Sequence, residues 1–304
     1  MKHRSLAISL ALALLCYSAA GAAPNLKPTA SFTVGHTHVD KYGGGEPSLI
    51  LIPGLTDSAA VWDGTVAAFS QTHTIYALTL AGFGGLKPVQ SNAIDTAVSD
   101  ISTLITQEHL VKPVVIGHSL GGFTAIRVAE EHGAQIRGAI AVDGLPVFPG
   151  MDKLTAAQRA AGASQFAGQF SHLDHDRFMA GEKLYAAYLT QPKNVVAVAA
   201  LSEGADPAAS GEYMTEMLSA DLRPALKNVS VPLLELAPFD STLDPYNPQG
   251  GFKTAMDKVA YYQSLFVNDP KANVQLVDNS RHFIMFDQPQ AFYDAVNAFL
   301  KTLP

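Results

Sequence analysis

Residues 117–121, Gly-His-Ser-Leu-Gly, match the pattern G-x-S-x-G and lie between a predicted strand over 113–118 and a helical pattern that begins at Leu120. On a sharp turn between a strand and a helix, a serine hydroxyl is pushed out above the end of the sheet, where it can act as a nucleophile. Glycine suits positions 117 and 121 because side chains there would press against the turning backbone, and Gly122 would let the helix pack close to the strand.

A serine hydroxyl attacks only when a base takes its proton, and the base in turn needs an acid that orients it. The ten histidines of the chain are the candidate bases, and aspartates at the ends of predicted strands are the candidate acids. The negative charge of the tetrahedral intermediate also needs two preorganised N–H donors. A complete set of these groups would cleave an acyl bond through an acyl-enzyme.

The elements that would position these groups alternate between short apolar strands and helices. We expect a strand pair or a long edge strand over 31–42, and further strands over 48–54, 74–80, 113–118, 136–144, 231–239 and 273–278. Helices are expected over 58–69, 92–110, 120–133, 252–267 and 288–301. This alternation predicts an α/β fold, a mostly parallel twisted sheet with helices on both faces.

The alternation stops in the Ala-rich stretch over 148–228, which has a helical pattern and no clear strand. A loop of that length is rarely without structure, so we expect a helical cap inserted between late strands. The core would then consist of residues 24–147 and 229–304.

The order of strand, G-x-S-x-G turn, cap, acid-bearing strand and late histidine resembles the α/β-hydrolase superfamily, specifically its capped serine esterase and epoxide-hydrolase-like branch. The resemblance covers essentially the whole chain after residue 23. It implies Ser119 as nucleophile and a triad in the order Ser, Asp, His. Dehalogenases and epoxide hydrolases of this superfamily carry an aspartate at the nucleophile position, so Ser119 argues against both activities.

The resemblance also implies the other two members of the triad. His282, in the stretch "DNSRHFIMFDQ" after the last predicted strand, is similar to the catalytic histidine of the family. The acid of the family follows the strand over 231–239, which favours Asp240. Asp244 is the second candidate, because Pro238 replaces the usual glycine of that turn. Asp143 is the third, since some relatives supply the acid from the strand over 136–144.

The oxyanion hole is implied in the same way. The backbone N–H of Leu120, the residue after the nucleophile, would be one donor. The stretch "PGLTDSAAVW" (53–62) is similar to the family's His-Gly-x loop, with Pro53 in place of the histidine, and makes the N–H of Leu55 the second donor. His118 would be a supporting residue whose side chain points away from the serine.

The substrate expected from this arrangement is a small or medium neutral carboxylic ester. The cap has several large apolar side chains that could contact it, and few cations that would bind an anionic group. Candidate contacts are Phe166, Phe170, Phe178, Met179, Tyr185, Tyr188, Met214 and Met217. Lactonases, thioesterases, carbon–carbon hydrolases and cofactor-free haloperoxidases use the same triad, and a non-catalytic relative could bind a small apolar ligand instead.

The first 23 residues have the three parts of a secretory signal peptide: a basic start, an apolar run over 6–15 and the small residues Ala20-Gly21-Ala22 before a proline. The run is too short to span a bilayer, so we expect cleavage near Ala22 and no stable membrane anchor. Export to the periplasm or the medium would leave a chain without cysteine, since Cys16 is the only one.

Charge and residue spacing exclude several partners. Loss of the signal peptide removes two basic residues and no acidic one, which changes the formal net charge from −7 to −9 and argues against nucleic acid or anionic membrane. His36 and His38, and the group His172, Asp174, His175 and Asp176, have metal-like spacing, but we interpret both as solvated surface. We therefore expect no metal and no cofactor; the oligomeric state is left open.

Overall fold

The computed structural model describes residues 26–167, 173–246, 251–269 and 271–304. The expected signal peptide, with Cys16, lies outside the described residues, as do Phe170 and His172. No helix of the described part is long and apolar enough to cross a membrane.

An eight-stranded sheet forms the centre of the molecule, with the strand order β1-β2-β4-β3-β5-β6-β7-β8. The strands are β1 (Ala30–Val34), β2 (Thr37–Gly43), β3 (Leu49–Ile52), β4 (Thr74–Thr79), β5 (Val114–His118), β6 (Gly138–Val142), β7 (Leu233–Phe239) and β8 (Ala272–Asp278). Strand β2 pairs antiparallel with β1 on one side and with β4 on the other, and the remaining pairs, from β4 through β8 in the strand order, are parallel. The mostly parallel sheet predicted from the sequence is thus confirmed.

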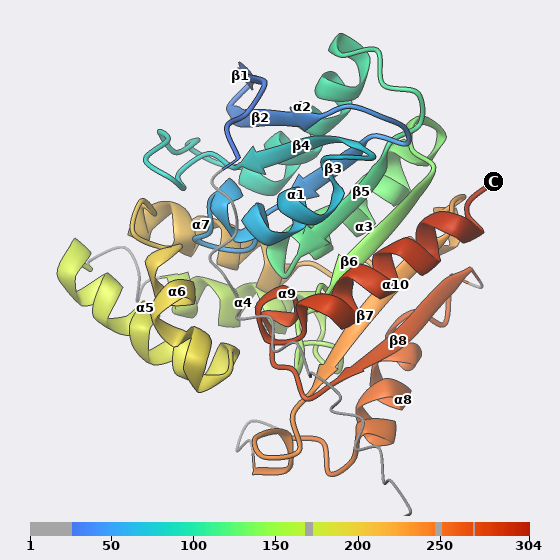
Figure 1. Cartoon of the computed structure of the whole chain (residues 1–304). Helices are drawn as coiled ribbons and strands as arrows, with labels where there is room; N and C mark the ends of the chain where they lie inside the picture. Colours follow the sequence, from blue (N-terminus) through green and yellow to red (C-terminus); the bar gives the residue numbers. More distant parts are fainter. Residues whose placement is uncertain (1–25, 168–172, 247–250, 270) are drawn as a thin grey trace, which may run out of the picture.

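Helices cover both faces of this sheet (Figure 1). They are α1 (Asp63–Phe69), α2 (Ala93–Gln107), α3 (Leu120–His132), α8 (Ala255–Leu265), α9 (Ile284–Asp287) and α10 (Pro289–Thr302), with short 3₁₀ turns η1 (Ala59–Trp62) and η2 (Gly133–Gln135). The fully buried strand β3 shows why two layers form. Ile50 and Ile52 pack with α2 and α3, whereas Leu49 and Leu51 pack with α1 and α10 on the other face.

Between β6 and β7 the described residues form only helices and turns. These are α4 (Ala156–Ala167), α5 (His175–Leu189), η3 (Pro192–Asn194), α6 (Val195–Ala200), α7 (Pro207–Ser219) and η4 (Leu226–Asn228), followed after β7 by η5 (Asp244–Tyr246). We call residues 148–228 the cap. Helix α4 packs against α7, and α5 packs against α6. Figure 1 shows these helices gathered at one side of the sheet rather than on its two faces.

Candidate active site

Ser119 occupies a strained turn between β5 and α3. Its φ of 54° and ψ of −116° are rare for a residue with a side chain, and such strain collects at functional sites. The turn leaves no room beside it: a Cβ on Gly117 would lie 1.9 Å from the Gly121 carbonyl oxygen, and a Cβ on Gly121 would lie 2.2 Å from the Ile52 carbonyl oxygen. The two glycines are therefore required by this backbone path.

Asp143 lies beside this turn because β5 and β6 are parallel neighbours. His118 pairs with Val142 in the register of the two strands, so Ser119 and Asp143 are the next residues of adjacent strand ends. Asp143 also has a left-handed φ, of 51°. Close contact fixes this strand end, since a Cβ on Gly144 would lie 2.4 Å from the Cα of Gly122.

His282 is paired with Asp143. The loop after β8 places the imidazole Nδ1 2.6 Å from Asp143 Oδ2, a distance typical of a strong hydrogen bond to a carboxylate. The second carboxylate oxygen accepts a hydrogen bond from the Tyr262 hydroxyl. Burial opposes the charge of Asp143, but His282, Lys258 and Tyr262 together outweigh burial and hold its pKa below the usual value. Asp143 is thus an ionised carboxylate aimed at the imidazole.

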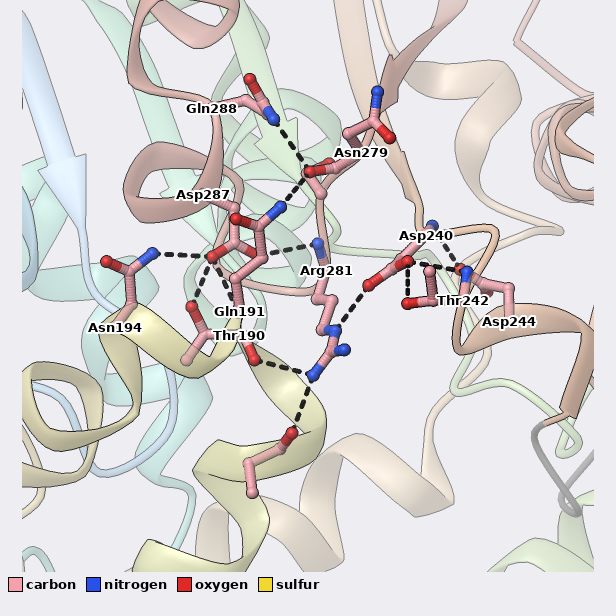
Figure 2. A network of polar contacts seen from close by, with 12 residues as sticks. Thr190, Gln191, Asn194, Asp240, Thr242, Asp244, Asn279, Arg281, Asp287 and Gln288 are labelled. Atoms are coloured by element: carbon pink, nitrogen blue, oxygen red, sulfur yellow. Dashed lines mark hydrogen bonds and ion pairs between the residues drawn. The ribbon is translucent and has the colours of Figure 1, made fainter.

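Asp240, the acid preferred from the sequence, pairs with Arg281 instead (Figure 2). Its Oδ2 accepts from Arg281 Nε at 2.7 Å, and its Oδ1 accepts from the backbone N–H and the hydroxyl of Thr242. Burial opposes the charge of Asp240, but these hydrogen bonds hold its pKa below the usual value. The preference for Asp240 as the partner of His282 is therefore wrong, because the arginine beside the histidine takes this carboxylate.

Asp244, the second candidate acid, is also committed elsewhere. Its Oδ1 accepts from Lys258 Nζ at 2.7 Å, and its Oδ2 accepts from the backbone N–H of Asp240 at 2.8 Å. Of the three candidates, only Asp143, the third choice from the sequence, contacts the imidazole of His282.

The two expected oxyanion donors lie at the ends of β3 and β5. Leu55 is in a turn closed by a 3.3 Å hydrogen bond from the N–H of Asp57 to the carbonyl of Gly54, with Thr56 at a φ of 68°. Leu120 is the first residue of α3, where a backbone N–H has no partner within the helix. Within the described part of the chain, neither N–H donates to a protein acceptor.

The cap is bonded to both sides of this site. On the oxyanion loop, the hydroxyls of Thr56 and Ser202 are hydrogen-bonded to each other at 2.7 Å, and Ser202 Oγ lies 3.1 Å from the Glu182 carboxylate of α5. On the histidine loop, Arg281 Nη1 donates to the carbonyls of Ala187 and Thr190, both at 2.9 Å (Figure 2).

Asp287 of α9 adds further bonds between the cap and the histidine loop (Figure 2). Its Oδ1 accepts from Thr190, Gln191 and Asn194, and its Oδ2 accepts from the backbone N–H of Arg281. Sequence reasoning missed these roles of Arg281 and Asp287, although their position on either side of His282 is a signal that could have suggested them.

The apolar side chains of the cap fall into distinct groups. Phe178 and Met217 are buried in the core, and Met179 and Met214 are partly buried against it. Tyr185 and Tyr188 are 59% and 67% exposed, so they lie on the outer surface of α5 in this structure.

The metal-like spacings are not assembled into a metal centre in the part of the chain that the structure describes. His38 Nε2 lies 3.3 Å from Asp40 Oδ1. Among the described residues, no group of three or more His, Cys, Asp or Glu residues could hold a metal ion.

A sequence profile of the alpha/beta hydrolase family matches residues 49–295. The chain belongs to this family. The match includes strands β3 to β8, the G-x-S-x-G turn, the cap and the histidine loop, which confirms the resemblance noted from the sequence.

Several curated relatives of this hydrolase are named as esterases. It is 25% identical over 241 residues to the pimeloyl-acyl-carrier-protein methyl ester esterase of Vibrio cholerae, with 77% of this chain and 90% of the relative covered. The protein of the same name from Yersinia enterocolitica is 24% identical over 244 residues, covering 77% of this chain and 93% of the relative.

Solved structures share the fold of this hydrolase. An esterase from Exiguobacterium antarcticum superposes with a TM-score of 0.70 at 18% identity, covering 88% of this chain and 96% of that one. The enol-lactonase from Burkholderia xenovorans has a TM-score of 0.68 at 17% identity, covering 90% of this chain and all of that one.

Proposed function

We propose that this hydrolase cleaves neutral carboxylic esters of small to medium size through an acyl-enzyme. The proposal rests on the contact between Asp143 and His282, in which the ionised carboxylate oxygen Oδ2 lies 2.6 Å from the imidazole Nδ1. Ser119 lies at the adjacent strand end in a strained backbone conformation. An imidazole held in this way has its Nε2 lone pair free to accept a proton.

The reaction follows from these positions. Ser119 Oγ attacks the ester carbonyl while His282 Nε2 accepts its proton, and Asp143 stabilises the imidazolium. The N–H groups of Leu55 and Leu120 stabilise the oxyanion, and each such donor is worth about 10²–10³ in kcat. The imidazolium then protonates the leaving alcohol. A water molecule activated by His282 attacks the acyl-enzyme, releases the carboxylic acid and restores Ser119.

A neutral substrate is supported by the charges of the cap. The buried Arg159 lies 3.5 Å from Asp221, and Arg223 donates to the same carboxylate at 2.8 Å. Both arginines are thereby paired and do not offer a free cation to an anionic acyl group. The names of the curated relatives support an ester with a small alcohol.

The test is labelling of Ser119 by a fluorophosphonate, with mass mapping of the adduct. The wild type should give one adduct on Ser119 and cleave an aryl acetate. Ser119→Ala should give no adduct and lose hydrolysis by at least about 10⁴-fold while it stays folded. A folded wild type without an adduct would contradict the proposal. A panel of esters, lactones and thioesters then defines the bond that is cleaved.

We also propose that the protein is exported. The proposal rests on the signal-like residues 1–23 and on the absence of cysteine after Cys16.

A further inference from the structure

Two buried titratable groups close to Ser119 in the fold have no role in the proposed reaction. Asp57, in the oxyanion loop, and His118, at the end of β5, are each 1% exposed. Asp57 Oδ2 lies 3.5 Å from His118 Nδ1, and neither atom has a closer hydrogen-bond partner in the described structure. Two buried polar atoms that face only each other need a proton between them.

The other imidazole nitrogen of His118 fixes where its hydrogen must be. His118 Nε2 lies 3.2 Å from the carbonyl oxygen of His282. A carbonyl only accepts, so Nε2 carries the hydrogen and donates it. In a neutral imidazole Nδ1 is then the acceptor. The proton between the two residues must therefore come from Asp57 as a carboxylic acid.

The charged groups around the pair favour this neutral arrangement. Burial raises the pKa of Asp57 to about 8, an effect that the nearby His282 only partly opposes. Burial and His282 lower the pKa of His118, although Asp143 opposes this shift. From the cap, Glu182 also faces Asp57.

We propose that Asp57 and His118 are positioning residues that share one proton and hold the histidine loop and the oxyanion loop in register. Asp57 O–H donates to His118 Nδ1, and His118 Nε2–H donates to the carbonyl of the base, His282. The chain of bonds thus joins Leu55, two residues before Asp57, to the loop that holds the base. Gly54 makes room for it, since a Cβ there would lie 2.8 Å from Nδ1 and 2.9 Å from Oδ2.

The arrangement has a defined response to alkali. Once Asp57 ionises, the imidazole is favoured with its hydrogen on Nδ1, where it faces a carboxylate. Nε2 then presents a lone pair to the carbonyl of His282, and that hydrogen bond is lost. Activity should therefore fall as the pH rises past about 8.

The kinetic test rests on the proposed ester hydrolysis and compares three variants. In Asp57→Asn the amide donates to Nδ1 at every pH, so kcat/KM at pH 7 should stay within about threefold and the fall near pH 8 should disappear. Asp57→Leu keeps the branched shape without a donor and should lower kcat by about tenfold or more with little change in KM. His118→Phe, which keeps a ring against Phe283 but has no N–H, should behave like Asp57→Leu.

Asp269→Asn is the matched control, because Asp269 is a buried carboxyl with a pKa raised by burial, in the α8–β8 connection away from the histidine loop. Its pH profile should match the wild type. An unchanged kcat in Asp57→Leu, or a profile of Asp57→Asn that superposes on the wild type, would overturn the proposal.

A second measurement does not need hydrolysis. Unfolding releases the shared proton between the usual histidine pKa of 6.5 and about 8, so this pair lowers the free energy of unfolding as the pH rises through that window. Below it the pair binds one proton in both states and adds no slope. In Asp57→Asn, His118 is the one titrating group of the pair. Unfolded His118 binds a proton below about pH 6.5 and buried His118 does not, so the free energy of unfolding should rise with pH up to that point and stay level above it. Equal pH dependence in the two proteins would show that no proton is shared, even if no ester is cleaved.

Discussion

Individual residues at this site adopt backbone conformations that their side chains disfavour. Thr56, Ser119 and Asp143 all have a φ between 51° and 68°. Each follows the C-terminal end of a different strand. Thr56 lies in the proposed oxyanion loop, Ser119 is the proposed nucleophile and Asp143 is the proposed acid. The strain is held by close packing, as between Gly122 and Gly144.

The acid can be assigned by a pair of substitutions. Asp143→Asn removes the negative charge that holds His282 and should lower kcat by about 10⁴-fold. Asp240→Asn leaves an amide oxygen for Arg281 and should lower kcat/KM by less than about tenfold. Steady-state hydrolysis of an aryl acetate measures both. If Asp240→Asn is the more damaging substitution, the pairing of His282 with Asp143 is not the one used in the reaction.

At the scale of the elements, strand β7, which lies between β6 and the edge strand β8, carries a buried acid. Glu235 is fully buried, and neither side-chain oxygen has a hydrogen-bond partner in the described structure. Burial raises the pKa of Glu235 well above the usual value, and the charge of Asp143 adds to this. Burial therefore favours the neutral carboxylic acid form of Glu235.

This acid makes the fold sensitive to pH. Above the usual carboxyl pKa of 4.5 the unfolded chain releases the proton of Glu235 while the folded chain keeps it. The unfolded state then binds fewer protons, so the free energy of unfolding falls as the pH rises, by up to about 1.4 kcal/mol per pH unit. Glu235→Gln removes this contribution. Chemical denaturation between pH 5 and 8 should show a flatter dependence in the variant, and parallel curves would refute the assignment.

The sequence was sufficient for the elements and for the local motifs. Alternating apolar strands and helices predicted the sheet, and the G-x-S-x-G turn and the late histidine are each readable within a few neighbouring residues. The partner of His282 could not be identified in this way, because it depends on which strand end lies next to the histidine loop in the folded chain. Asp240 has the expected offset from its strand, yet Arg281 competes for it. The contact between Asp57 and His118 joins two strand ends, which no local pattern contains.

Across the whole molecule, hydrogen bonds join the cap to the core at the histidine loop. Arg281 and Asp287 bind the end of α5 and the turn after it, and the N–H of Phe283 donates to the carbonyl of Leu189 at 3.1 Å. The loop that holds His282, the proposed base, is thus also hydrogen-bonded to the cap. Any substitution that shifts α5 should reach His282 through these bonds.

Export is a prediction for the whole chain. Expression of the full sequence in a Gram-negative host should give a periplasmic protein whose intact mass corresponds to a start at Ala23, next to the expected cleavage after Ala22. Arg4→Glu, which weakens the basic start, should slow processing and leave precursor in the cells. Recovery of the uncleaved chain from the cytoplasm alone would contradict export.

The left-handed backbone at Thr56, Ser119 and Asp143 separates what the fold needs from what the site needs. Glycine adopts such a φ without steric cost, so glycine at any of the three positions would relieve strain. The same exchange would remove the proposed nucleophile, the proposed acid or the Thr56 hydroxyl that contacts the cap. Strain at these three positions is therefore the stability that the fold gives up to place these side chains at neighbouring strand ends.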